Sequence, residues 1–222
     1  NVLVTGFFYG TVDFGGGPLA SAGDYDIFVL KLSGANGAHL WSKRFGDTTF
    51  DWGNWVTVDP SGNVLVVGTF QGTVGFGGSP LVSAGLNDIF VAKLSGANGA
   101  HIWSKGFGDT DDQFARYVAT DASGDVLVSG QIQGTTDFGG GVLTSAGARD
   151  IFVTKLSGAN GAHLWSKSFG DTVNDFGAQV TADATGNVFL TGQFQGTVDF
   201  GGGALVSAGN RDIYVLKLAG AS

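Results

Sequence analysis

Short blocks rich in apolar residues recur along the whole chain, and none shows the spacing of an amphipathic helix. The clearest run of four blocks is NWVTVD (54–59), NVLVVG (63–68), DIFVAKL (88–94) and HIWSKGFG (101–108). Glycine, proline and asparagine separate such blocks, so we expect four short β-strands, which we name A, B, C and D. Strands B and C are apolar on both faces, which is typical of a sheet that is covered on both sides.

The pattern returns every 62 residues. KLSGANGAH stands at 31–39, 93–101 and 155–163, and a shortened copy begins at Lys217. The period divides the chain into a single array of units: 1–62, 63–124, 125–186 and the partial unit 187–222.

A β-helix would need a shorter period, and a sandwich has no reason to repeat at this spacing. A four-stranded antiparallel unit with a long fixed period predicts an all-β protein, a β-propeller. We expect about three and a half blades, in the order B-C-D, A-B-C-D, A-B-C-D and A-B-C.

The ordered motifs resemble those of a known family. The series D-x-x-G-[ND]-V-[LF]-[VL]-x-G, D-F, D-I-[FY]-V-x-K-L and W-S-K-x-F-G is similar to the bacterial SBBP β-propeller repeats over the whole chain. The resemblance implies a propeller fold in a secreted or surface-exposed bacterial protein. Most members of that family have no assigned activity, so the resemblance carries the fold further than the function.

A partial resemblance concerns tryptophan. The pair Gly37 and Trp41, which recurs in the next two units, is similar to the tryptophan-docking motif of quinoprotein propellers. That motif also has Ala, Asp and Thr at positions where this chain has Lys31, Ser33 and Asn36. The resemblance implies docking between blades and does not imply quinone chemistry.

Composition and charge narrow the possible partners. The formal net charge is −8 with 11 basic residues and no basic stripe, which argues against nucleic acid as a partner. No apolar run approaches the roughly 18 residues of a spanning helix, so membrane insertion is not expected. The chain has no cysteine and no methionine, even at position 1, so we expect a piece of something longer. Propellers usually have about four to eight blades. We therefore expect self-association, or the remainder of a parent chain, to complete the ring.

Histidine and charged residues recur at fixed positions. His39, His101 and His163 occupy one repeat position, so propeller symmetry spreads them around a ring and we interpret them as structural. Aspartate precedes strand C and lysine lies near its end in every unit, as with Asp26 and Lys31. Because buried ions need partners, we expect each charge to meet another on an adjacent strand or blade.

No cofactor is expected, and calcium is the alternative. Calcium prefers six to eight oxygen ligands, and the FGDT aspartates stand near further carboxylates: Asp47, Asp109 and Asp171 with Asp51, Asp112 and Asp175. The DFGGG stretches, as at 13–17, lack the following helix and the Lys-Ser/Thr of a phosphate-binding loop. We interpret them as glycine turns in a hairpin between strands B and C. No catalytic constellation stands out, and the sequence does not predict an enzyme.

The units differ mainly in the B–C and D–A loops, which share one face of a propeller. The A–B and C–D turns on the other face are nearly uniform. Varying aromatic, charged and amide side chains are typical of a recognition surface, and drift on tolerant loops is the alternative. The candidate binding residues are Tyr25, Trp55, Asn87, Arg116, Tyr117, Arg149, Gln179 and Arg211. An aromatic residue is kept at 52, 114 and 176, and we expect that position to pack.

These features predict a non-enzymatic binding or adhesion scaffold that recognises a glycan or a protein through the B–C/D–A face. The family resemblance implies a location outside the cell or at a bacterial cell surface. A purely structural module for spacing or assembly is the alternative. A propeller enzyme is a further alternative, and it would need a unique polar cluster near the axis.

Overall fold

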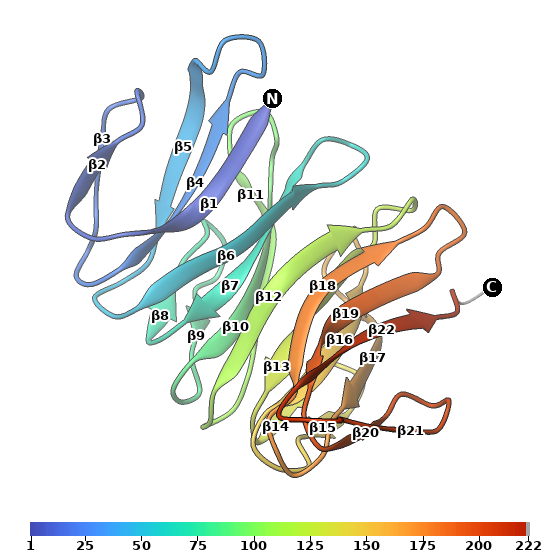
Figure 1. Cartoon of the computed structure of the whole chain (residues 1–222). Helices are drawn as coiled ribbons and strands as arrows, with labels where there is room; N and C mark the ends of the chain where they lie inside the picture. Colours follow the sequence, from blue (N-terminus) through green and yellow to red (C-terminus); the bar gives the residue numbers. More distant parts are fainter. Residues whose placement is uncertain (221–222) are drawn as a thin grey trace.

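The computed structural model describes residues 1–220, and that part of the chain forms strands and turns without a helix. Four antiparallel sheets stand side by side in an arc (Figure 1). They are the blades of a β-propeller, and their strand order B-C-D, A-B-C-D, A-B-C-D and A-B-C confirms the predicted fold class. Among residues 1–220 no helix is long and apolar enough to cross a membrane.

Blade 1 takes its strands from the first repeat unit, and blade 2 takes its A strand from the first unit and its other strands from the second. Blade 1 consists of β1 (Val2–Phe8), β4 (Asp26–Leu32) and β5 (His39–Phe45). Blade 2 consists of β6 (Asp51–Val58), β7 (Val64–Phe70), β10 (Asp88–Leu94) and β11 (His101–Phe107). Blade 1 therefore begins with its B strand, β1, whereas blade 2 begins with its A strand, β6.

The last two blades follow the same plan. Blade 3 consists of β12 (Gln113–Thr120), β13 (Val126–Ile132), β16 (Asp150–Leu156) and β17 (His163–Phe169). Blade 4 consists of β18 (Phe176–Ala182), β19 (Val188–Phe194) and β22 (Asp212–Leu218). Strands β1, β6, β12 and β18 lie next to one another along the inner edge of the arc (Figure 1).

Each B–C connection folds into a two-stranded hairpin of its own. The hairpins are β2 (Thr11–Asp13) with β3 (Pro18–Ala20), β8 (Thr73–Val74) with β9 (Leu81–Val82), β14 (Thr135–Asp137) with β15 (Val142–Thr144), and β20 (Thr197–Asp199) with β21 (Ala204–Val206). The Asp13 carboxylate accepts hydrogen bonds from the amides of Gly15 (2.7 Å) and Gly17 (3.0 Å), which closes the DFGGG turn. The glycine turn is thus confirmed, whereas the strands that flank it were not predicted.

The histidines hold these hairpins against the blades. Nε2 of His39 lies 3.0 Å from the Ser42 hydroxyl, and its ring packs on the hairpin at Gly16. A Cβ at Gly16 would stand 2.1 Å from the ring, so this position must be glycine while the ring stays in place. Since His101 and His163 repeat the arrangement, the structural interpretation of the histidines agrees with the geometry.

The core lies between blades and not within them. Along strand β7, Val64 and Val66 pack toward blade 1, whereas Leu65 and Val67 pack toward blade 3. A third cluster, which includes Leu127 and the C strand β16, fills the space between blades 3 and 4. Strands B and C are apolar on both faces because each sheet is packed between two others.

The repeated KLSGANGAH segment docks one blade on the next. The indole N–H of Trp41 (3.3 Å) and the ammonium group of Lys31 (2.5 Å) both donate to the carbonyl of Gly96, in the C–D turn of blade 2. Trp103 of blade 2 meets the carbonyl of Gly158 in blade 3 in the same way, at 3.2 Å. The tryptophan-docking geometry that the sequence implied is therefore present, with a lysine added to it.

Two lysines at the repeat position of Lys31 are also paired with a carboxylate of their own blade. Lys93 lies 2.8 Å from Asp59, and both side chains are almost fully buried. In the next blade Lys155 meets Asp121 at 2.7 Å. The expected charge partners are confirmed for these lysines. Of the aspartates that precede strand C, Asp26 pairs with Arg44, and Asp88 instead accepts a hydrogen bond from a loop amide.

Candidate functional site

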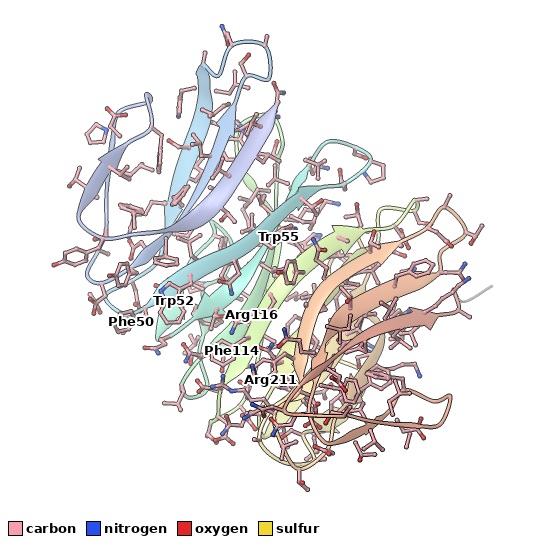
Figure 2. The ribbon with its side chains drawn as sticks, viewed as in Figure 1. Phe50, Trp52, Trp55, Phe114, Arg116 and Arg211 are labelled. Atoms are coloured by element: carbon pink, nitrogen blue, oxygen red, sulfur yellow. The ribbon has the colours of Figure 1, made fainter. Side chains whose placement is uncertain are left out.

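The B–C and D–A loops meet at one end of the inner strands, and we call this surface the loop-end face. It has two parts, which are distinguished by chemistry. The aromatic patch comprises Phe7, Tyr9, Tyr25, Phe50 and Trp52. The arginine row comprises Phe114, Arg116, Arg149, Phe176 and Arg211. Figure 2 shows labelled members of both parts following one another along the loop ends of β6, β12 and β18.

The aromatic patch joins blade 1 to blade 2. The rings of Phe7 and Tyr25 meet edge to face at 5.3 Å, and Tyr25 lies 5.9 Å from Phe50. Trp52 closes the group, at 5.8 Å from Phe50 and 6.1 Å from Phe7. Tyr9 is 69% exposed and Phe7 is 50% exposed. The rings support one another and still present a large apolar surface to solvent.

The arginine row continues this surface over blades 3 and 4. The guanidinium groups of Arg116 and Arg149 both lie over the ring of Phe114, at 5.0 and 4.7 Å from its centroid. Arg211 lies over the ring of Phe176 at 4.2 Å. Guanidinium groups stack on aromatic faces by cation–π attraction. The retained aromatic position was expected to pack, and Phe114 is indeed buried, but it is buried under arginines.

A polar chain orients the arginine row. The Gln71 amide donates to Asn87 (3.2 Å), and Asn87 donates to the Asp112 carboxylate (2.6 Å). Asp112 also accepts a long hydrogen bond from Arg149 at 3.4 Å. Tyr25, Asn87, Arg149 and Arg211 share one repeat position, so the variable residue before strand C faces this surface in every blade.

The structure corrects the position of three candidates. Trp55 and Tyr117 lie within β6 and β12, and their rings are 4.7 Å apart on the inner edge of the arc. Gln179 occupies the equivalent place in β18. Figure 2 shows Trp55 farther along its strand than Phe50 and Trp52. A β-bulge, between Gly53 and Trp55 in β6, shifts the register of each A strand. These three residues therefore line the inner edge and not the loop-end face.

A groove lies beside Trp55 on the inner edge. It has a volume of about 330 Å³, lies between β1 and β6, and is lined by Leu3, Val4, Thr5, Asn54, Trp55 and Val56. It holds no titratable side chain, so it offers shape and apolar contact and no acid–base chemistry.

Buried carboxyl groups lie beneath the loops. Asp51 is fully buried with one oxygen unpartnered, and burial together with the nearby Asp47 and Asp26 raises its pKa to about 8. Burial likewise raises the pKa of Asp88 and of Asp175 to about 6. Burial keeps these groups neutral or partly neutral, although the backbone amides that donate hydrogen bonds to them favour the ionised form.

The FGDT aspartates act as loop anchors. Asp109 accepts hydrogen bonds from the amide and the hydroxyl of Thr135, both at 2.6 Å, and these bonds lower its pKa against the opposing effect of burial. Residues 1–220 contain no group of three or more His, Asp or Glu side chains placed to hold a metal ion. The calcium alternative therefore has no ligand set in the described part of the chain.

Comparison with known proteins finds a distant relative that supports the fold class. No family model matches the chain. The chain is 24% identical over 212 residues to an uncharacterized WD repeat-containing protein of Acanthamoeba polyphaga mimivirus, in a match that covers 79% of this chain and 15% of the relative. The chain thus spans only a small part of the length of that protein. The resemblance to SBBP repeats stays a prediction.

The fold and this relative define the chain as a β-propeller repeat protein, a class whose architecture suggests a binding or scaffold role. The expected location outside the cell or at a bacterial cell surface is wrong. The relative is a viral WD repeat protein, and it does not point to a bacterial surface.

Proposed function

We propose that the chain is a non-enzymatic binding scaffold that recognises a protein through the loop-end face. The aromatic patch is the observation that carries this proposal. Five mutually supporting rings with two strongly exposed members form the kind of apolar surface that marks interaction sites on soluble proteins. Aromatic anchors also supply much of the affinity in protein interfaces.

Protein is favoured over glycan by the way the rings are turned. Sugar rings bind best on flat, open aromatic faces. In the patch, Tyr25 meets Phe7 at an interplanar angle of 83° and Phe50 at 30°, so neighbours restrict access to its faces. The faces of Phe114 and Phe176 carry guanidinium groups. The surface therefore suits side chains inserted between rings better than a pyranose laid across one.

The experiment compares matched double variants of the chain on protein and glycan arrays. Phe50→Ala with Trp52→Ala removes two rings of the loop-end face, and Asn36→Ala with Asn98→Ala alters exposed turns on the opposite face. We expect the first pair to weaken binding of a protein ligand by roughly tenfold or more and the second to leave it unchanged. Circular dichroism of each variant separates lost contacts from lost folding.

The inner edge provides the third arm of the same experiment. Trp55→Ala with Tyr117→Ala removes the ring pair that the structure places away from the loops. If this pair alone weakens binding, recognition occurs on the inner edge and the proposal is wrong. Glycans bound with no protein ligand would also contradict it.

A second candidate function is a structural module for assembly. Ile213 and Val215 on β22 are both 79% exposed, whereas Ile89 and Val91 at the same repeat positions are fully buried against the following blade. The exposed face of blade 4 is thus built like faces that other blades cover. A chain with this role would self-associate in sedimentation and show no ligand dependence on the loop-end face.

A further inference from the structure

The arginines stand outside the repeat pattern. All seven lysines occupy two repeat positions, on the C and D strands, and serve the blades. Three of the four arginines instead gather in the arginine row. Arg116 has Asn54 and Ala178 as its counterparts in neighbouring units, so the repeat itself does not require a cation there. A local concentration of guanidinium groups is unusual in a chain of formal net charge −8.

Other side chains position the guanidinium group of Arg116, but no carboxylate of the described residues pairs with it. Its Nε donates to the Gln131 side-chain oxygen at 3.2 Å, and its guanidinium group rests on Phe114. Within residues 1–220 no carboxylate oxygen lies within 4.0 Å of it. Burial and the nearby Arg149 both lower the pKa of Arg116, which shows that its charge is disfavoured where it stands. A half-buried cation next to another cation is costly unless an anion joins them.

The row already contains one example of the anion it accepts. The Asp112 carboxylate lies 3.4 Å from Arg149, on the side of the row that faces blade 2. Arg149 therefore has a partner, whereas Arg116 and the exposed Arg211 have none among the described residues. The planar guanidinium group presents paired N–H donors that match the two oxygens of a carboxylate.

We propose that the arginine row binds carboxylates of an acidic peptide segment, whose apolar side chains contact the aromatic patch. This inference rests on the proposed function and names the chemistry of its ligand. Charge complementarity selects the occupant, because uncompensated cations beside exposed aromatic rings match a segment that mixes Asp or Glu with Phe, Trp or Leu. Arg116 makes the central contact, and Arg149 and Arg211 flank it.

The test uses a panel of fluorescent synthetic peptides of mixed acidic and aromatic sequence, measured by anisotropy with the 222-residue chain. Each peptide has a matched partner in which Asn or Gln replaces every Asp or Glu. We expect the acidic peptides to bind and their amide partners to bind roughly tenfold more weakly or not at all. Increasing salt should weaken the acidic peptides more than the amide partners.

Three variants of the chain locate the contact. Arg116→Gln is expected to weaken the acidic peptides by roughly tenfold, and Arg116→Lys to restore only part of the loss, because lysine lacks the planar fork. Lys167→Gln is the matched control, since it removes one positive charge from an exposed position on the D strand of blade 3. It should leave binding unchanged.

The outcomes separate this inference from the proposed function. If peptides bind and depend on Trp52 but not on Arg116, the loop-end face recognises protein and the carboxylate inference is wrong. Equal binding of acidic and amide peptides overturns the inference as well. Binding of hyaluronan or sulfated oligosaccharide probes, with no binding of peptides up to about 1 mM, overturns both, since 1 mM corresponds to an affinity of only about 4 kcal/mol.

Discussion

Replacing Asp51 by Asn tests the electrostatics beneath the loop-end face. The Asp51 side chain is fully buried, and its Oδ2 accepts a hydrogen bond from the Asp47 amide at 3.1 Å while Oδ1 is unpartnered. Asp26 and Asp47 are the nearby carboxylates and Arg44 is the nearby cation. The unit that follows has Gln113 at this position, so a neutral amide already occupies the equivalent site in this fold.

The magnitude follows from the pKa. A carboxyl whose pKa rises from 3.8 to about 8 on folding keeps a proton that the unfolded chain releases. The contribution of Asp51 to the free energy of unfolding therefore falls as the pH rises from about 4 to about 8, and this contribution is flat outside that window. At about 1.36 kcal/mol for each pKa unit, the upper bound is about 6 kcal/mol. Because relaxation and water entry reduce such penalties, we expect about 2–4 kcal/mol.

The Asn variant carries a neutral group at every pH, so it avoids this loss. We expect Asp51→Asn to match the wild type near pH 4 and to exceed its free energy of unfolding at pH 8 by about 2–4 kcal/mol. Urea unfolding followed by tryptophan fluorescence at pH 4, 6 and 8 measures the difference. Asp24→Asn is the control, because it removes a carboxylate from an exposed position and should change stability by less than about 0.5 kcal/mol. Equal or lower stability of Asp51→Asn at pH 8 would refute the reasoning.

Two further predictions concern the contacts that hold the blades and hairpins. Lys93→Met leaves a buried carboxylate and a docking carbonyl without their cation, so we expect the free energy of unfolding to fall by about 3–5 kcal/mol. The exposed Lys167→Met is the control and should lower it by less than about 0.5 kcal/mol. Similar melting temperatures for the two variants would contradict the docking role. Gly16→Ala places a methyl group against the His39 ring and should lower the free energy of unfolding by about 1–3 kcal/mol. Gly202→Ala, at the same repeat position with nothing within 4 Å, should leave it nearly unchanged. Equal thermal stability of these two variants would exclude the hairpin contact.

The repeat explains how much of the fold the sequence could reveal. Four copies of one pattern show the same turns and apolar blocks, so strand order and the two-sided burial of strands B and C could be predicted before any coordinates. The B–C hairpins were missed as strands because they are two or three residues long and rich in glycine. In three of the hairpins, hydrogen bonds from the turn amides to an aspartate close the turn, and apolar periodicity does not mark it.

The site was harder to predict because it depends on contacts between distant segments. Trp55 was assigned to the wrong surface because the bulge after Gly53 leaves no signature in the residues around it. Phe114 was expected to pack, and its partner Arg149 comes from another loop of the blade. One signal was available: an aromatic residue is retained at 52, 114 and 176, while the residue before strand C is arginine only in the last two units.

Four of the five tryptophans provide the most direct test of recognition by the loop-end face. Trp52 lies in the aromatic patch, Trp55 on the inner edge, and Trp41 and Trp103 in the docking contacts between blades. In two-dimensional NMR spectra of the 15N-labelled chain, titrated with the tightest ligand from the arrays, each indole N–H reports on its own region. The account predicts that the Trp52 signal shifts with the ligand while those of Trp55, Trp41 and Trp103 stay in place. A shift of the Trp55 signal with an unmoved Trp52 signal would contradict it.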